Sequence, residues 1–166
     1  MSANDLWLID GYAQFFRAFH AIRTEMRSPV TSEPTNMTYG FVDMLLKLQT
    51  VHRPRRLAVA LDVSGDRGTF RNQIYPEYKA NRDAPPSELK PQVERCLSLL
   101  GQLGIPVYGS EGFEADDVIA TIVRRIRREE GDVAIRIVSK DKDLQQLLDD
   151  QVSMVDVHKD SWIGPA

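Results

Sequence analysis

Short apolar runs alternate with longer stretches of helical periodicity along most of the chain. The runs at 6–9, 57–61, 105–108, 133–138 and 152–157 have the length and composition of buried strands. Between them, apolar residues recur at helical spacing over 12–22, 38–50, 87–101 and 114–130, and a short helix is expected over 144–148. This alternation predicts an α/β fold, with a mostly parallel central sheet of about five strands and helices on both faces.

Residues 63–86, which we call the arch, interrupt this pattern because no hydrophobic periodicity persists through them. A connection of this length inside a compact domain is usually functional or mobile. Basic and aromatic residues alternate along it: Arg67, Phe70, Arg71, Tyr75, Tyr78, Lys79 and Arg82. Such a mixture suits single-stranded nucleic acid, because cations contact phosphates and aromatic rings stack on bases. A solvated loop with its aromatic side chains packed on the core is the alternative.

The composition is that of one globular domain. With 166 residues, of which 42% are hydrophobic, the chain can bury one core, and we expect a single domain over 1–166. Its one cysteine, Cys96, excludes a disulfide framework within the chain and indicates a reducing compartment. Without a signal segment or an apolar run of membrane length, we expect a soluble, cytoplasmic protein with no membrane partner. The net charge of −3 favours no partner by itself.

Acidic residues follow the predicted strands at the points where they end. Asp10, Asp62 and the Asp141/Asp143 pair lie at or just past strand ends, and the helix after the third strand begins with Glu114, Asp116 and Asp117. Because the carboxyl ends of parallel strands meet at one edge of the sheet, we expect these carboxylates to converge there. A set of carboxylates without Cys or His suits Mg²⁺ or Mn²⁺ rather than zinc.

A carboxylate site with room for two ions is typical of phosphoryl transfer, in which one ion activates water and the other stabilises the leaving oxygen. The chain has no glycine-rich nucleotide loop, so the phosphate is expected to belong to a nucleic acid backbone. Each acid alone has a simpler interpretation as a turn or helix-capping residue. Capping does not explain why the acids occupy successive strand ends, and the whole set favours metal binding.

These motifs, in this order, resemble those of the 5′ nuclease family, which includes flap endonucleases and the 5′–3′ exonuclease domain of bacterial DNA polymerase I. The resemblance covers essentially the whole chain. It rests above all on Tyr78-Lys79-Ala80-Asn81-Arg82, Glu114-Ala115-Asp116-Asp117 and Ser139-Lys140-Asp141-Lys142-Asp143. It implies a PIN-like or resolvase-like α/β domain and a divalent-metal-dependent 5′–3′ exonuclease or 5′ flap endonuclease that hydrolyses DNA in replication and repair.

The resemblance also implies roles for individual residues. Asp10, Asp62, Glu114 and Asp116 would surround a first ion, with Asp117 acting partly through water, and Asp141 and Asp143 would hold a second. Lys79 and Arg82 would offset charge at the scissile phosphate, and Tyr78 would support the unpaired nucleotide. Arg17, Phe70 and Arg71 are further candidates for contact with the DNA.

The family continues past residue 166 with a helical segment that binds duplex DNA and completes the second ion site, and that segment is absent here. The chain is either a fragment of a longer protein or a minimal version, and its ending, Trp162-Ile-Gly-Pro-Ala166, favours a fragment. We expect such a fragment to bind one ion well, to bind a second ion and DNA weakly, and to have weak activity or none. The implied partners are DNA with a 5′ end or flap at a junction of single and double strand, and a polymerase domain in the same or another chain.

Three alternative functions are compatible with parts of the sequence. A PIN-type ribonuclease shares the fold and the acidic site but lacks the arch motif. A non-catalytic nucleic-acid-binding domain would use the acids only as caps. A phosphotransfer signalling domain would fit the α/β pattern and leave the arch unexplained.

Overall fold

The computed structural model describes residues 4–65, 68–81 and 84–165, and its centre is a six-stranded sheet in the order β3-β2-β1-β4-β5-β6. The strands are β1 (Asp5–Asp10), β2 (Arg56–Ala60), β3 (Val107–Tyr108), β4 (Ala134–Val138), β5 (Val152–Asp156) and β6 (Ser161–Ile163). The first five run parallel, and β6 pairs antiparallel with β5. The predicted mostly parallel α/β sheet is confirmed, with one strand more than expected at its edge.

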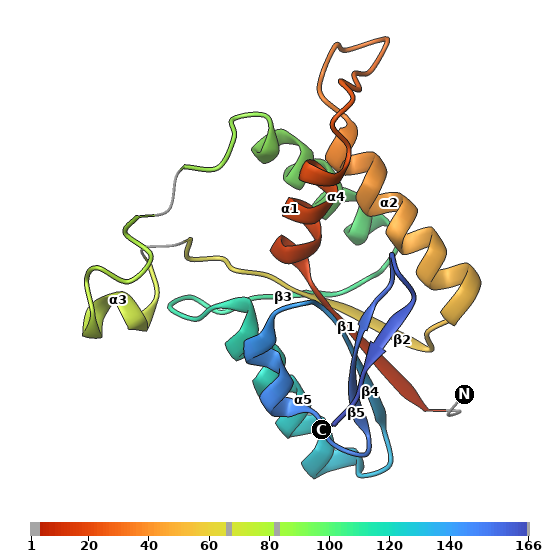
Figure 1. The fold of residues 1–166 in the computed structure, drawn as a ribbon, viewed down its shortest axis with the longest axis vertical. Helices are drawn as coiled ribbons and strands as arrows, with labels where there is room; N and C mark the ends of the chain where they lie inside the picture. The colour runs from red at the N-terminus through yellow and green to blue at the C-terminus, as the bar shows by residue number, and fades with distance from the viewer. Residues whose placement is uncertain (1–3, 66–67, 82–83, 166) are drawn as a thin grey trace.

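Helices cover both faces of this sheet. They are α1 (Gly11–Ala21), α2 (Asn36–Lys47), α3 (Phe70–Ile74), α4 (Leu89–Gln102) and α5 (Ala115–Glu130), with a π-helical turn η1 (Leu48–His52) and a 3-10 helix η2 (Lys142–Leu147). Figure 1 shows α5 on the opposite side of the strands from α2 and α4. None of the helices that the structure describes is long and apolar enough to cross a membrane.

The strands are apolar on both faces, which is why each face carries a core. Along β1, Trp7 and Ile9 join one buried cluster with α1, α2 and α4, whereas Leu6 and Leu8 join a second with α5 and η2. This division follows from the alternation of side chains along a strand. Continuous apolar runs are therefore the expected pattern for a parallel sheet covered on both sides.

Two predicted helix starts differ from the structure, and a contact distant in sequence accounts for the first. The helix expected from residue 38 begins at Asn36, since the buried Gln92 side chain of α4 accepts hydrogen bonds from the N–H groups of Met37 (2.9 Å) and Thr38 (3.1 Å). The helix expected from residue 87 begins at Leu89, without a capping side chain. The contacts of Gln92 have no local signature in the sequence.

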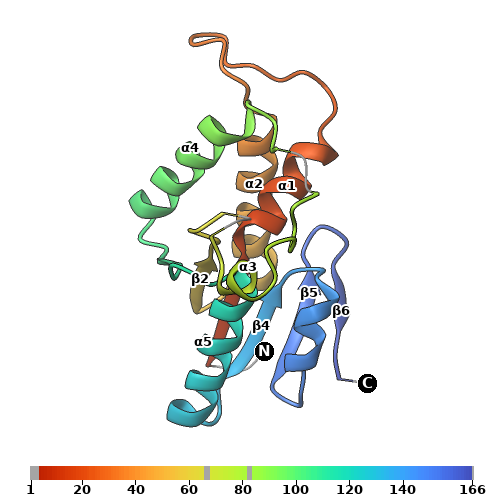
Figure 2. The same ribbon diagram turned by 90° about the vertical axis from the view of Figure 1, so that its left-hand side faces the viewer.

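The arch contains the short helix α3, which the sequence pattern did not predict, and it is attached to the loop before α5. The Phe70 N–H donates to Gly112 O (2.8 Å), and the Gly112 N–H donates to Ser64 Oγ (2.7 Å). The Phe70 and Phe113 rings lie 5.5 Å apart. Figure 2 shows α3 in front of the start of α5, and Figure 1 shows that α3 is set out to the side of the sheet, with the loop before α5 reaching toward it.

Candidate metal centre and nucleic-acid interface

The order of strands along the sheet reverses at β1, which lies between β2 and β4. Ligand sites of open α/β sheets form at such a point, outside the carboxyl ends of the strands. Asp10 ends β1, and its Oδ2 accepts a hydrogen bond from Ser139 Oγ (2.8 Å), directly after β4. Burial raises the pKa of Asp10, and the charges of Asp62 and Asp141 raise it further against the hydrogen bond from Ser139.

The first turn of α5 lies at the same edge and is tied to the end of β2. Asp62 Oδ1 accepts a hydrogen bond from the Ala115 N–H at 2.6 Å, and the Glu114 N–H donates to Asp117 Oδ2 at 3.0 Å. These bonds satisfy N–H groups that have no partner inside the helix. Asp62 and Asp117 therefore do cap the start of α5, and the same hydrogen bonds hold both carboxylates in place.

Asp116 marks the centre of the acidic group. Its pKa rises to about 7, first because it is buried and then because Asp10, Asp141, Asp62 and Glu114 add negative charge around it. These five carboxylates come from four separate parts of the chain. Their mutual repulsion in a half-buried site would be relieved by a cation. We call Asp10, Asp62, Glu114, Asp116 and Asp141 the carboxylate cluster.

The cluster has the donor atoms that a hard divalent ion requires, because all of them are carboxylate oxygens. Glu114 Oε1 is buried and has no hydrogen-bond partner among the residues that the structure describes. Within this same part of the chain, no three Asp, Glu, His or Cys side chains stand close enough together to hold an ion as they are. Several of these oxygens face protein N–H groups or cations instead, so side chains must turn slightly for an ion to bind.

Asp141 and Asp143, the two acids after β4, make different contacts. Asp141 Oδ1 accepts a hydrogen bond from the Asp143 N–H (2.9 Å) and so caps η2, in line with the capping interpretation of a single acid. The Asp141 N–H in turn donates to Ser139 Oγ (3.1 Å), which links it to Asp10. Both side chains are exposed, and Asp141 is one of the charges that raise the pKa of Asp116.

Two cations of the arch form ion pairs with acids at the N-terminus of α5. Lys79 Nζ lies 2.9 Å from Glu114 Oε2, and Arg71 makes two hydrogen bonds to the Asp117 carboxylate, at 2.6 and 2.8 Å. The hydrogen bonds from Arg71 lower the pKa of Asp117 despite its partial burial. The arch is therefore held against the carboxylate cluster by opposite charges.

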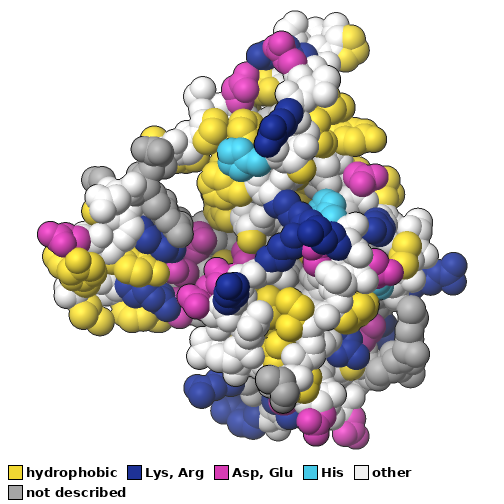
Figure 3. Space-filling model, in the orientation of Figure 1, with side chains coloured by type: hydrophobic (Ala, Val, Ile, Leu, Met, Phe, Trp, Pro, Cys, Tyr) yellow, Lys and Arg dark blue, Asp and Glu magenta, His cyan; other side chains and the backbone are white. Residues whose placement is uncertain are grey.

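The aromatic candidates of the arch accompany these cations. Arg71 lies over the Phe70 ring at 4.7 Å, and Lys79 Nζ lies 5.3 Å from the centre of the Tyr78 ring. Lys79 has a left-handed backbone, with φ of 58°. Arg82 and Arg67 lie outside the described residues. Figure 3 shows acidic side chains where the arch meets the body of the molecule, with Lys and Arg side chains on either side of them.

The remaining candidate, Arg17, forms an ion pair that the sequence reasoning did not anticipate. Its Nη1 and Nη2 atoms contact the two carboxylate oxygens of Asp156, at 2.6 and 3.3 Å. Asp156 ends β5 and is buried, with 5% of its side chain exposed. The strand predicted over 152–157 placed Asp156 inside the strand, so the rule that drew attention to Asp10 and Asp62, an acid at or past the end of a parallel strand, did not select it.

Comparison with known proteins places residues 5–166 in one family. A family model described as "5′-3′ exonuclease, N-terminal resolvase-like domain" matches residues 5–166. DNA polymerase I of Mycobacterium tuberculosis is 42% identical over 150 residues, which cover 90% of this chain and 16% of that protein. A 5′-3′ exonuclease of the same organism is 38% identical and is matched over 89% of this chain and 48% of its own length. The chain thus spans about one sixth of the DNA polymerase I relatives.

Solved structures agree with these sequence relationships. The phage T5 5′-exonuclease with zinc ions bound has a TM-score of 0.69 and 26% identity, over 96% of this chain and 58% of that one. A T5 flap endonuclease variant in complex with DNA and metal ions has a TM-score of 0.67 and 25% identity, over 96% of this chain and 57% of its own. With the family model matched over nearly every residue, the chain belongs to the family of 5′-3′ exonuclease N-terminal, resolvase-like domains.

Proposed function

We propose that the chain is the metal-binding catalytic part of a 5′–3′ exonuclease or 5′ flap endonuclease that hydrolyses DNA. The observation that carries the proposal is the carboxylate cluster, in which five acids from four parts of the chain act on one another at the switch point of the sheet. The cationic arch beside it supplies the contacts that a polyanion needs. The relatives described as exonucleases and flap endonucleases support the same activity.

In this proposal, Asp10, Asp62, Glu114 and Asp116 hold a first Mg²⁺ or Mn²⁺, with Asp117 acting through water. Asp141 and Asp143 hold a second. Such ions supply an activated water and stabilise the leaving oxygen of the phosphodiester. Ser139 keeps Asp10 oriented through its 2.8 Å hydrogen bond.

The arch would act on the DNA rather than on the ions. Lys79, which reaches the cluster through Glu114, and Arg82 are proposed to offset the negative charge that develops on the scissile phosphate. Tyr78 would support the unpaired nucleotide, and Phe70, Arg71 and Arg17 would contact the strand. Without DNA, Lys79 and Arg71 form ion pairs with Glu114 and Asp117. They must exchange these carboxylates for phosphates when DNA binds.

The proposal includes the organisation and setting of the protein. Residues 1–166 would form one catalytic domain in which 63–86 is an arch-like insertion. The substrate would be DNA with a 5′ end or flap at a single/double-strand junction, and a polymerase domain would accompany it, as the DNA polymerase I relatives suggest. A bacterial cytosolic location is expected on the same grounds.

Cleavage of a 5′-labelled flapped DNA in Mg²⁺ tests the proposal. We expect shortened 5′ products with Mg²⁺, none with EDTA, and a loss of at least about 100-fold in rate for Asp116→Asn. Asp132→Asn is the matched control, because Asp132 is an exposed acid in the turn between α5 and β4. Equal cleavage by Asp116→Asn would contradict the proposal. Preferential cleavage of a structured RNA would replace it with the PIN-type ribonuclease.

A further inference from the structure

Asp156 gathers more hydrogen-bond donors than any role as a turn residue requires. In addition to Arg17, its carboxylate contacts Lys140 Nζ at 2.8 Å and accepts the N–H groups of His158 (3.1 Å) and Lys159 (3.3 Å). Burial of Asp156 raises its pKa, but the hydrogen bonds from Arg17 and Lys140 outweigh burial and hold that pKa well below its usual range. One buried carboxylate thus fixes two cations from separate elements.

The charges around Asp156 do not cancel. Arg17, Lys140, the exposed Lys159 and Lys47 of α2 carry four positive charges, against the three negative charges of Asp156, Asp160 in the same turn, and Asp43 near His158. His158 contributes no charge at neutral pH, because burial and the neighbouring Arg17 lower its pKa. The result is an excess of positive charge on a surface built around an acid.

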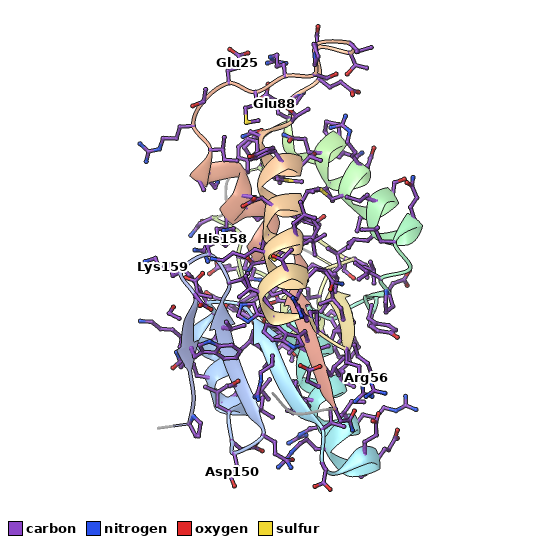
Figure 4. All side chains as sticks on the ribbon, turned by 90° about the vertical axis from the view of Figure 1, so that its right-hand side faces the viewer. Glu25, Arg56, Glu88, Asp150, His158 and Lys159 are labelled. Atoms are coloured by element: carbon purple, nitrogen blue, oxygen red, sulfur yellow. The ribbon has the colours of Figure 1, made fainter. Side chains whose placement is uncertain are left out.

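The β5–β6 hairpin that carries these residues is itself held in place. Lys47 of α2 donates to the carbonyl oxygen of His158 at 3.1 Å. Figure 4 shows His158 and Lys159 at the end of the hairpin that lies against α1 and α2. The cations of this surface therefore project from an anchored part of the fold, and not from a free loop.

The surface adjoins the carboxylate cluster through the backbone. Lys140 lies between Ser139, which is bonded to Asp10, and Asp141 of the cluster. Arg17 lies on α1, which begins directly after Asp10. Both cations therefore belong to segments of the chain that also carry acids of the cluster.

We infer that Asp156 is a positioning residue, which holds Arg17 and Lys140 as a preformed pair that binds one DNA phosphate beside the carboxylate cluster. The inference rests on the proposed function. The guanidinium has five N–H donors and the ammonium three, so both keep donors for phosphate while they contact Asp156. Because long cationic side chains lose much rotamer freedom on binding, a pair fixed in advance binds with a smaller entropic loss.

A purely electrostatic view of Asp156 makes the opposite prediction. If this residue only neutralised two cations, then Asp156→Asn would remove a negative charge and strengthen the binding of DNA. If it positions them, the same substitution weakens binding although the protein becomes more positive. The sign of the change in Kd therefore separates the two accounts.

The experiment measures the anisotropy of a fluorescent flapped DNA in EDTA, over a series of salt concentrations. We expect Asp156→Asn to raise Kd about three- to tenfold and to reduce the slope of log Kd against log salt by about one phosphate contact. Lys140→Met should reduce the slope by a similar amount. Asp149→Asn is the matched control, because Asp149 pairs with Arg127 (2.8 Å) in the turn before β5, away from the strand ends of the cluster, and its loss should leave Kd unchanged.

Two further readouts keep the result interpretable. If Mn²⁺ still raises the Tm of Asp156→Asn, the carboxylate cluster is folded in the variant. In cleavage assays, Asp156→Asn should raise KM and leave kcat nearly unchanged. Unchanged or tighter binding by Asp156→Asn, while the parent chain binds and cuts DNA, would overturn this inference alone. A parent chain that neither binds nor cuts DNA would overturn the proposed function and this inference with it.

Discussion

Lys79 and Glu114 form an ion pair at 2.9 Å that joins the arch to the carboxylate cluster. One oxygen of Glu114 contacts the ammonium, and the other is buried without a hydrogen-bond partner among the described residues. Lys79 thus stands as a counter-charge at a site whose acids repel one another. An ion that bound Glu114 would compete with Lys79 and release it toward the substrate.

This competition predicts the behaviour of Lys79→Met. Without the ammonium, Mn²⁺ should bind more tightly, by about three- to tenfold, because no protein cation has to be displaced. The metal-free variant should have a lower Tm than the parent, since Glu114 loses its partner. Calorimetric titration with Mn²⁺ measures the affinity, and Lys90→Met, on the exposed side of α4, serves as the control. Weaker binding of Mn²⁺ by Lys79→Met would refute the competition.

Replacement of Asp116 tests the repulsion within the cluster. In EDTA, Asp116→Asn should be more stable than the parent by about 1 kcal/mol, because it removes one of five mutually repelling charges. It should also lose the rise in Tm that Mn²⁺ gives to the parent. Thermal unfolding with EDTA and with Mn²⁺ measures both effects. A variant that is less stable in EDTA and still responds to Mn²⁺ would show that the acids do not share a site.

The ion pairs of Asp156 predict a loss of stability in acid. Its folded pKa lies below the ordinary value, so the stabilisation is fully present above about pH 4 and is lost as the pH falls through the folded pKa. We expect Asp156→Asn to be less stable than the parent at pH 7, on the order of 2 kcal/mol, and the difference to shrink below pH 4. Urea unfolding at pH 7, 4 and 3 measures it. A difference that is constant with pH would mean that the ion pairs do not contribute.

Gly11 connects Asp10 to α1 where no side chain fits. A Cβ atom there would lie 2.9 Å from the carbonyl oxygen of Ala60 and 3.0 Å from side-chain atoms of Val59 and Leu61. Gly11→Ala should therefore lower the free energy of unfolding by about 2 kcal/mol and displace Asp10. Gly101→Ala, in the last turns of α4 with open space around it, should instead stabilise the protein by up to about 1 kcal/mol. Equal effects of the two substitutions in urea unfolding would contradict this packing argument.

The parts of the fold that the sequence predicts are those set by periodicity. Apolar runs separated by helical stretches predicted the parallel sheet, and acids at strand ends predicted that Asp10, Asp62, Asp116 and Asp141 lie near one another. Both predictions depend on short-range patterns and on the general geometry of parallel sheets. They needed no knowledge of particular contacts.

The parts that could not be predicted depend on contacts between distant residues. Gln92 sets the start of α2 from another helix, and Lys79 reaches Glu114 across the arch. The short strand β6 exists because β5 offers it an edge to pair with. Asp156 was missed for two reasons, because the predicted strand ran on to residue 157 and because its partners are distant in sequence.

The central claim, that the carboxylate cluster holds divalent ions, is tested most directly by an anomalous-difference map from crystals soaked in Mn²⁺. The account predicts a peak bounded by Asp10, Asp62, Glu114 and Asp116, with oxygen atoms at roughly 2.1 to 2.3 Å. A second peak about 4 Å away, toward Asp141 and Asp143, would establish the two-ion arrangement. The contradicting result is a map without a peak at the cluster, in which Lys79 is still paired with Glu114 and the Ala115 N–H still bonds to Asp62. The acids would then serve only as caps and ion-pair partners, and the account would be wrong.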